Sequence, residues 1–464
     1  MKKHLLFFII FLLFSFANKS YSQNKEFSFL EYIAFVKKYH PLVKIANLQI
    51  TEAESKLLIA RGAFDPKLES YLEQKDFNKK DYYSVFNGTL KIPTWYGVEL
   101  KASLDKNEGL YLNPENNVPE TGLLSAGIGI NLNSIIIDDR RAALKQAKIG
   151  LSLSKNTQLI EANKVLYNAT IAYLNWKKAY EEFETYKEIY TLAKNRELGI
   201  KKLIQLEENA AIDGVEAQSN TIKRQLSYEN AQVKLLKAKL ELSIFLWINN
   251  NVPIELENQI VPEKSISSSI ETVLKINENL ENNVNLQNHP KVNALIRKRE
   301  QLEIEQKLIK SKFIPNFYVN YNFLSEQQDN LLITHQNNKI NFTFSYPLFL
   351  RKERGYAKLN QQKIDAQNLE IEFEKINIKN NIIIKQKEIE VLKNQQANFI
   401  QMLENNKRLL QAEETLFSVG ESSLFLIITR ENNLLNTNLE FINFQYQLNK
   451  SYAELFKYLS PQIN

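Results

Sequence analysis

The sequence offers little from which a catalytic or metal site could be built. It contains no cysteine and four histidines, at positions 4, 40, 289 and 335. No two of these histidines have the spacing of a metal-ligand pair, and no glycine-rich phosphate loop is present. The absence of cysteine excludes disulfides, thiolate metal sites and a cysteine nucleophile. We therefore predict no enzymatic activity, no catalytic residue, no metal and no cofactor.

The polar side chains best placed for a function lie in two short breaks between long helical segments. The first break contains Glu207, Glu208 and Asp213, and the second contains Gly420, Glu421, Ser422, Ser423 and Leu424. Carboxylates and hydroxyls at helix turns can hold neighbouring turns together by hydrogen bonds. They can equally be solvated turn residues, with Asp213 capping a helix. Both interpretations stay open at this point.

The two breaks lie in a chain whose sequence landmarks occur twice, in the same order. His40-Pro41 recurs as His289-Pro290, and Pro66 recurs as Pro315, both at an offset of 249 positions. Arg141 recurs as Arg354 at an offset of 213. A period this long is not that of a solenoid repeat, whose units have about 20–50 residues. The chain is therefore predicted to contain two similar halves.

Residues 1–22 have the features of an export signal. Lys2 and Lys3 precede an apolar run over positions 5–16, and Ser20 and Ser22 supply small residues before Gln23. The run is too short to span a bilayer, which takes about 20 residues. Without this segment the chain has 56 basic and 53 acidic residues, so the charge gives no support to a nucleic-acid partner.

Hydrophobic periodicity predicts the same order of elements in each half. The first repeat, 23–248, has helices over 27–38 and 42–63, strands within 67–133, a long helix over 141–206 and a return helix over 215–247. Residues 249–288 form a connector, with a short helix near 267–277. The second repeat, 289–464, has a helix over 292–312, strands within 316–346, a long helix over 355–417 and a return helix over 424–458.

The strand regions alternate an apolar face with a polar one. Val98, Leu100, Ala102 and Leu104, for example, alternate with charged and polar residues. Segments of about 10 such residues are typical of a membrane β-barrel wall, although a soluble antiparallel sheet gives the same alternation. The exported, aromatic-rich chain favours the membrane wall. The polar faces carry both signs of charge, from which we expect no strong ion selectivity.

The chain resembles the TolC family of outer-membrane efflux proteins over essentially its whole mature length. The resemblance is carried by the two His-Pro helix starts, the Phe-x-Pro entries to the strands at 64–66 and 313–315, the tract 210–217 and the turn 417–425. It implies a mainly α fold in which long antiparallel helices form a periplasmic α-barrel. It also implies that four to six strands per chain join a shared trimeric outer-membrane β-barrel. The strand count stays open because an extra hairpin is predicted to turn at Pro93–Gly97.

The resemblance also implies a function. The chain would be a homotrimeric channel in the outer membrane with a periplasmic extension. It would be the exit duct of a tripartite efflux or type I secretion system, working with a periplasmic adaptor and an inner-membrane pump of the RND or ABC type. The eight turn residues would form the periplasmic aperture and the adaptor-docking site. The alternatives are a pump-independent porin and a structural coiled-coil protein.

Overall fold

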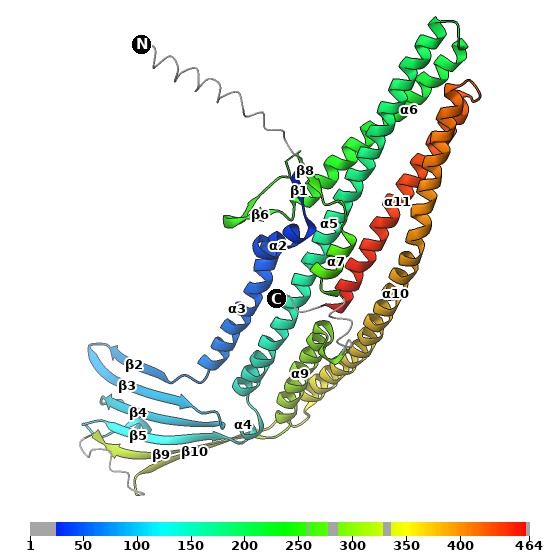
Figure 1. Ribbon diagram of the computed structural model, residues 1–464. Coiled ribbons are helices and arrows are strands. Elements are labelled where there is room, and N and C mark those ends of the chain that lie inside the picture. Colours follow the sequence, from blue (N-terminus) through cyan, green and yellow to red (C-terminus); the bar gives the residue numbers. More distant parts are fainter. Residues whose placement is uncertain (1–24, 258, 277–285, 328–335, 461–464) are drawn as a thin grey trace, which may run out of the picture. The chain divides into compact units, whose positions relative to one another are not determined.

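The computed structural model describes residues 25–257, 259–276, 286–327 and 336–460. The predicted export signal, His4 and His335 lie outside these residues. The chain forms two compact units (Figure 1). Unit 1 comprises Met1–Ile45, Glu161–Val284 and Ile378–Asn464, and unit 2 comprises Ala46–Ile160 and Asn285–Asn377.

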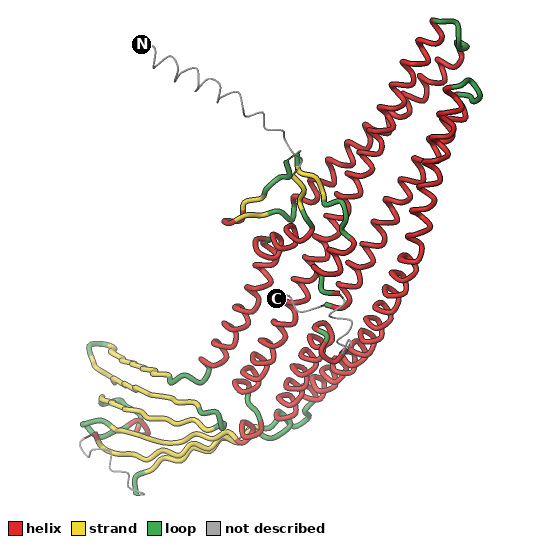
Figure 2. The backbone as a smooth tube through the Cα atoms, in the orientation of Figure 1, coloured by secondary structure: helices red, strands yellow, loops and turns green. Residues whose placement is uncertain are grey.

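Unit 2 contains a six-stranded antiparallel sheet with the order β10-β9-β5-β4-β3-β2. Its strands are β2 (Lys67–Phe77), β3 (Lys80–Pro93), β4 (Val98–Glu108), β5 (Leu123–Asn131), β9 (Asn316–Glu326) and β10 (Asn338–Ser345). The pairing of β5 with β9 joins the two halves of the chain in one sheet. The extra hairpin, β3–β4, pairs on both sides, so it is part of the sheet. The sheet curls, as Figure 2 shows.

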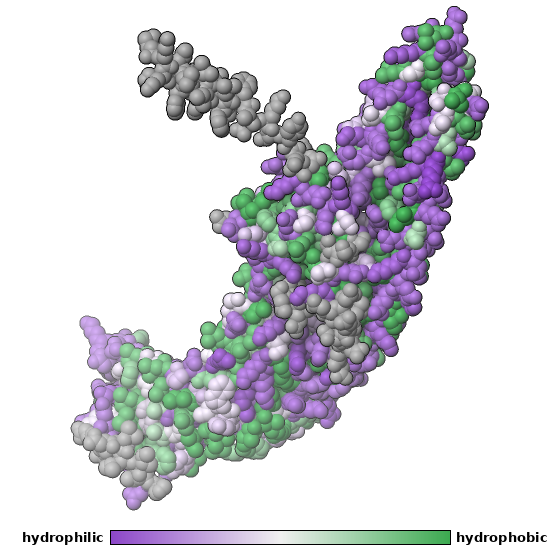
Figure 3. Space-filling model, viewed as in Figure 1, coloured by the Kyte–Doolittle hydropathy of each residue, from purple (hydrophilic) through white to green (hydrophobic). Residues whose placement is uncertain are grey.

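The two faces of this sheet differ in polarity. Directly paired residues form an apolar row across five strands: Ile92, Leu100, Ile128, Tyr321 and Ile340. Several large apolar side chains of this face are exposed in the single chain, among them Leu68 at 80%, Leu72 at 67% and Phe342 at 60%. Figure 3 shows hydrophobic residues along the strands. A surface of this kind indicates contact with an apolar environment.

The edges of the sheet are open in the single chain. Strands β2 and β10 each pair on one side only, and all of their residues are exposed. Each therefore presents a row of backbone N–H and C=O groups without partners in the sheet, which is the arrangement that adds another strand.

Two very long helices follow the strand regions. Helix α5 (Asp139–Gln205) has 67 residues and α10 (Arg351–Ser418) has 68, so each is about 100 Å long. They turn back into α6 (Ala211–Ser243) and α11 (Leu424–Leu459). Three starts fall earlier than predicted, since α5 begins at Asp139, α6 at Ala211 and α10 at Arg351. At α5 the reason is visible, because Asp138 Oδ1 accepts from Arg141 N at 2.8 Å and extends the helix start.

Shorter helices precede the strand regions in both halves. Helix α2 (Phe29–Tyr39) begins with a capping box between Ser28 and Glu31. Helices α3 (Pro41–Gly62) and α9 (Pro290–Ser311) each follow a histidine. The Nδ1 atoms of His40 and His289 accept from the backbone N–H two residues on, both at 3.2 Å. The repeated histidines therefore start helices.

The core of unit 1 lies where α2 packs on α5. Phe29, Tyr32, Tyr173 and Trp176 are fully buried, with ring centroids 5.3–5.4 Å apart. The Tyr173 hydroxyl donates to the Phe27 carbonyl oxygen and accepts from the Glu263 N–H. These bonds attach the parallel strands β1 (Lys25–Phe27) and β8 (Ile260–Pro262) to α5. The connector also contains β7 (Val252–Pro253) and α7 (Ser267–Val273), and β7 pairs with β6 (Trp247–Ile248), which directly precedes the connector.

A substitution at Gly127 tests the pairing of β5 with β9. A Cβ atom at this position would lie 2.1 Å from Asn322 Oδ1 and 2.2 Å from the Tyr321 carbonyl oxygen. We expect Gly127→Ala to lower the midpoint of thermal unfolding, measured by circular dichroism in detergent, because the two strands would have to move apart.

Gly199, within α5, is the matched control. A Cβ atom there meets nothing within 4 Å. We expect Gly199→Ala to leave stability unchanged or to raise it by about 0.5–1 kcal/mol, because alanine loses less backbone entropy in a helix. If Gly127→Ala were as stable as Gly199→Ala, the close approach of β5 to β9 would be contradicted.

Candidate functional site

The two helix turns of unit 1 have the same backbone geometry. In the first, Glu207 N donates to Ile204 O and Glu208 N to Leu203 O. In the second, Gly420 N donates to Phe417 O and Glu421 N to Leu416 O. Both turns thus close with a bond across five residues and one across three, the pattern of a Schellman cap. Gly420 and Glu207 occupy the left-handed position, with φ of 81° and 66°. Their numbers differ by 213, the offset of Arg141 and Arg354.

The returning helices begin differently. Asp213 accepts from Asn209 Nδ2 at 3.2 Å in the first turn of α6, whose start lacks a side-chain cap. Helix α11 is capped by Ser423, whose Oγ accepts from Leu426 N. Ser422 Oγ donates to the buried carboxylate of Glu413, which also faces Arg430 Nε at 3.4 Å. The second turn is therefore held to helices α10 and α11 through the carboxylate of Glu413. The first turn is held only by a hydrogen bond between two of its own residues.

A small apolar cluster joins the two turns. Ile200, Ala217 and Leu424 are 2–4% exposed and pack together. Leu203, Ile204, Phe417 and Ile428 surround them. Leu424 therefore differs from the other seven predicted site residues, none of which is buried. Its expected role as an adaptor contact stays a prediction; within the single chain its side chain supports the turns from beneath.

Behind this cluster lies an ionic layer that the sequence did not predict. Glu431 is 2% exposed and accepts from Arg196 Nη1 at 2.6 Å. Arg196 also faces the more exposed Glu414 at 3.4 Å. Arg224, likewise 2% exposed, donates to Asn432 Oδ1 at 2.8 Å. Burial lowers the pKa of Arg224, and the nearby charge of Glu431 opposes that shift. Helices α5, α6, α10 and α11 all contribute to this layer.

The sequence did contain a signal for these residues. Buried positions on α6 and α11 follow heptad spacing, and Arg224 and Glu431 occupy such positions among Ala217, Thr221, Leu424 and Leu435. A charged residue in a coiled-coil seam is costly unless it is paired, and it commonly fixes the register of the helices. Charged residues in the seams therefore indicated a buried pair.

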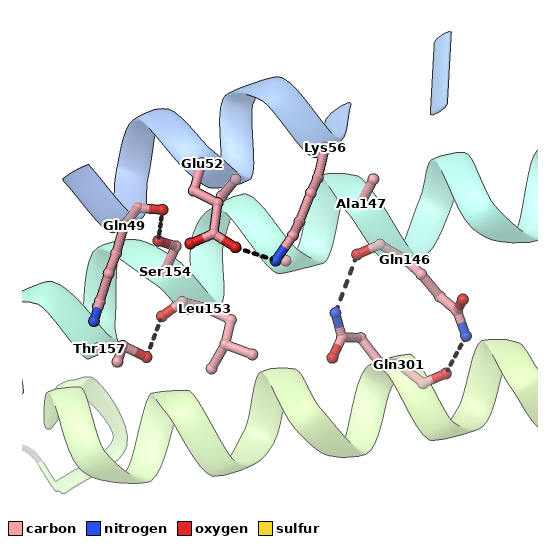
Figure 4. A pocket seen from close by; sticks show the side chains of 11 residues that line it. Gln49, Glu52, Lys56, Gln146, Ala147, Leu153, Ser154, Thr157 and Gln301 are labelled. Atoms are coloured by element: carbon pink, nitrogen blue, oxygen red, sulfur yellow. Dashed lines mark hydrogen bonds and ion pairs between the residues drawn. The ribbon is translucent and has the colours of Figure 1, made fainter. Parts of the chain in front are cut away.

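A polar hollow of about 540 Å³ lies in unit 2 among α3, α5 and α9. Figure 4 shows Gln146 and Gln301 facing each other from α5 and α9. Each amide donates to the other residue's backbone carbonyl, at 3.3 and 3.1 Å. Lys56 pairs with Glu52 at 2.6 Å within α3. These groups hold helices together, and we assign them no ligand.

The described residues contain no group of three or more His, Cys, Asp or Glu side chains arranged to hold a metal ion. Nor does any helix in the described ranges combine the length and the apolar character needed to cross a membrane.

The fold is similar to that of solved outer-membrane channels, although no protein-family model and no curated protein matches the sequence. The CmeC outer membrane channel of Campylobacter jejuni is 16% identical, covering 93% of this chain and 85% of that one, with a TM-score of 0.65. The outer membrane protein VceC of Vibrio cholerae is 12% identical, covering 92% and 95%, with a TM-score of 0.64. The MtrE outer membrane channel of Neisseria gonorrhoeae, in its open state, is 12% identical, covering 93% and 88%, with a TM-score of 0.63.

Substitution of the two glutamates of the ionic layer should lower stability by unequal amounts. Among the residues that the structure describes, Glu431 is the one buried carboxylate bonded to Arg196; Glu431→Ala removes it and leaves Arg224 without this nearby opposite charge. We expect it to cost about 3 kcal/mol and to speed amide hydrogen exchange at the ends of α5, α6, α10 and α11. Glu414→Ala, at a side chain that is 45% exposed, should cost less than about 1 kcal/mol. Equal exchange in both variants would contradict the layer's role in joining the turns.

Proposed function

Because the chain has the fold of the TolC family of outer-membrane channels, we propose that it is one subunit of a homotrimeric outer-membrane channel. In this proposal the channel is the exit duct of a tripartite efflux or type I secretion system. A periplasmic adaptor opens it, and an inner-membrane pump of the RND or ABC type supplies the substrate. The observation that carries the proposal is the six-stranded sheet, with one apolar face and two open edges.

A lipid environment accounts for both properties of the sheet. The exposed apolar face, with Leu68, Leu72 and Phe342, would contact lipid tails. Open strand edges do not occur in lipid, because nothing there can bond their backbone groups. Joining β2 of one chain to β10 of the next removes both edges. Three copies of six strands would then close an eighteen-stranded wall, wide enough for an aqueous channel.

The outer face of α6 supports assembly from several copies. Its buried positions follow one heptad seam, with Ala217, Ala231 and Leu242 packed within the chain. A second seam, which runs along α6 to its C-cap residue Ile244, is 49–69% exposed: Ile212, Val215, Ile222, Leu226, Val233, Leu236, Leu240 and Ile244. Steps of three, four and seven residues along this seam are those of coiled-coil packing. A row of large apolar residues of this length indicates a missing helical partner.

Helix α10 carries a matching outer seam. Ile384, Val391, Met402, Leu409 and Leu416 are 36–56% exposed and lie in one row at heptad spacing. From Ile384 to Leu416 the seam spans 33 residues, the same span as from Ile212 to Ile244 on α6. Helix α10 runs toward its helix turn, whereas α6 runs away from its own. The two seams would therefore pack antiparallel between neighbouring copies. The partner on this face would be a second copy of the chain.

The α6 seam gives the test of assembly. We expect the double variant Leu226→Glu, Leu236→Glu to lose the trimer in detergent, measured by size-exclusion chromatography with light scattering, because two buried charges per interface would be unpaired. Lys237→Glu is the control, since the Lys237 side chain is 77% exposed, pairs only weakly with Glu241 and lies beside the seam. Trimers retained by the double variant would contradict this interface, and a wild-type monomer would contradict the proposed channel.

The periplasmic aperture is proposed at the two turns. The mouth would be surrounded, and the adaptor met, by residues of both turns: Glu207, Glu208 and Asp213 of the first, and Gly420, Glu421, Ser422, Ser423 and Leu424 of the second. The loosely tied first turn is the better candidate for movement, since Asp213 bonds only locally while Ser422 is held by Glu413. The length of the helices also argues against a pump-independent porin, whose periplasmic turns are short.

Charge reversal at Asp213 tests the aperture. We expect Asp213→Lys to raise the conductance of the channel in planar bilayers, because six turns around the axis would lose attractive contacts with their neighbours. Glu216→Lys, one turn further along α6, is the control for a change in charge alone. Unchanged conductance in Asp213→Lys would contradict the aperture role. No channel activity in the wild-type protein would favour the alternative of a structural coiled-coil protein.

A further inference from the structure

The polar face of the sheet carries an unusual row of like charges. Lys67 pairs directly with Lys91, and Lys91 pairs directly with Lys101, across strands β2, β3 and β4. Directly paired side chains share a face, with Cβ atoms about 4.5–5.5 Å apart, and like charges in such positions are destabilising. A sheet under selection for stability alone would avoid this row.

Two glutamates offset part of the repulsion. Lys91 pairs with Glu69 at 2.5 Å, and Lys101 pairs with Glu99 at 3.2 Å. Arg140, at the start of α5, lies 3.9 Å from the same Glu99. Lys67 makes no ion pair with any residue that the structure describes. We name Lys67, Lys91, Lys101 and Arg140 the basic band; against Glu69, Glu99 and Asp138, which lies 3.6 Å from Arg140, it leaves a net charge of +1 per chain.

The next strand is shaped to hold one of these lysines. Lys101 pairs in register with Gly127 of β5, and Gly129 follows on the same face. Without side chains at these glycines, Tyr318 reaches across β5 and its hydroxyl accepts from Lys101 Nζ at 2.7 Å. A Cβ atom at Gly129 would lie 2.6 Å from that hydroxyl oxygen. Lys101 is therefore positioned from both sides rather than left to extend freely.

The rest of the polar face carries both signs of charge. On β9 and β10 it has one acid, Glu326, and one base, Lys339, among Tyr318, Asn320, Asn322, Asn341 and Thr343. On β2, β3 and β4 it also carries Glu73, Lys75 and Asp105. The basic band differs from the rest of the polar face in its directly paired lysines, which lie at the end of the sheet where β3 and β4 turn and α5 begins. The charges of the face as a whole are mixed, as the sequence suggests, and cations gather in this band.

We infer that the basic band makes the duct anion-selective, favouring solutes that carry carboxylate, phosphate or sulfonate groups. The inference rests on the proposed channel function, in which the polar face lines the lumen. Three copies would place a net charge of +3 in one ring at this level. Because charges lining a low-dielectric wall raise the local concentration of counter-ions, anions would enter the ring more readily than cations.

The test is the reversal potential of the purified full-length channel in planar bilayers under a KCl gradient. We expect the wild type to prefer chloride to potassium. The preference should grow when the salt is lowered from about 1 M to about 0.01 M, since the Debye length rises from about 3 to 30 Å. This salt series needs no variant, so it holds even where a substitution impairs folding.

Two matched pairs of substitutions should move the selectivity in opposite directions. Lys91→Gln with Lys101→Gln should reduce the chloride-to-potassium permeability ratio by about twofold or more, and Glu69→Gln with Glu99→Gln should increase it. Lys106→Gln is the control, because Lys106 pairs with Phe86 on the apolar face of the same sheet and should leave the ratio unchanged.

The outcomes separate this inference from the proposed function. If the channel prefers potassium, or if the chloride-to-potassium permeability ratio is the same in both double variants, the role of the basic band in selectivity is contradicted. The proposed channel function is not affected by that result. A protein that forms no channel overturns the proposed function and the band with it. Opposite shifts in the two double variants, with no shift in Lys106→Gln, support the band.

Discussion

The rest of the structure depends on the hydrogen-bonding requirement of a backbone strand at the edge of a sheet. Strands β2 and β10 each leave one row of N–H and C=O groups unpaired, and the same sheet exposes an apolar face. Water can satisfy the edges but not the apolar face, whereas lipid suits the face but not the edges. In a single chain, therefore, neither water nor lipid can satisfy both the strand edges and the apolar face. Additional copies meet both in lipid, which is why the arrangement favours a closed wall built from several chains.

The helices also leave a surface uncovered in the single chain, but here it consists of apolar side chains. Within one chain, α6 buries small residues such as Ala217 and Ala231, and Ala217 packs with Ile200 of α5. The large residues of α6 lie on the other side, in the exposed seam that contains Leu226 and Leu236. Apolar seams alone would allow the helices to slide by one heptad. The buried Glu431, bonded to Arg196, fixes one register because any shift would leave a charge unpaired.

Much of this fold could be predicted from the sequence because its signals are local. Alternation with a period of two marks the strands, and heptads mark the long helices. The two turns could be found because Gly420 and the polar residues near Glu207 interrupt those heptads. The link between Arg196 and Glu431 could not, since 235 positions separate them and no local pattern gives the pairing partner. The burial of Leu424 was missed for the same reason, because it depends on Ile200 and Ala217 of another hairpin.

The differences between the two halves carry as much information as their likeness. The offset between landmarks falls from 249 to 213, which corresponds to the extra hairpin β3–β4 in the first half. That hairpin is fully paired in the sheet, so it widens the wall by two strands per chain. On the polar face it brings Lys91 and Lys101, two of the four members of the basic band, together with Glu99 and Asp105. One insertion thus changes the width of the proposed duct and the placement of charge along it, without altering the helices that follow it.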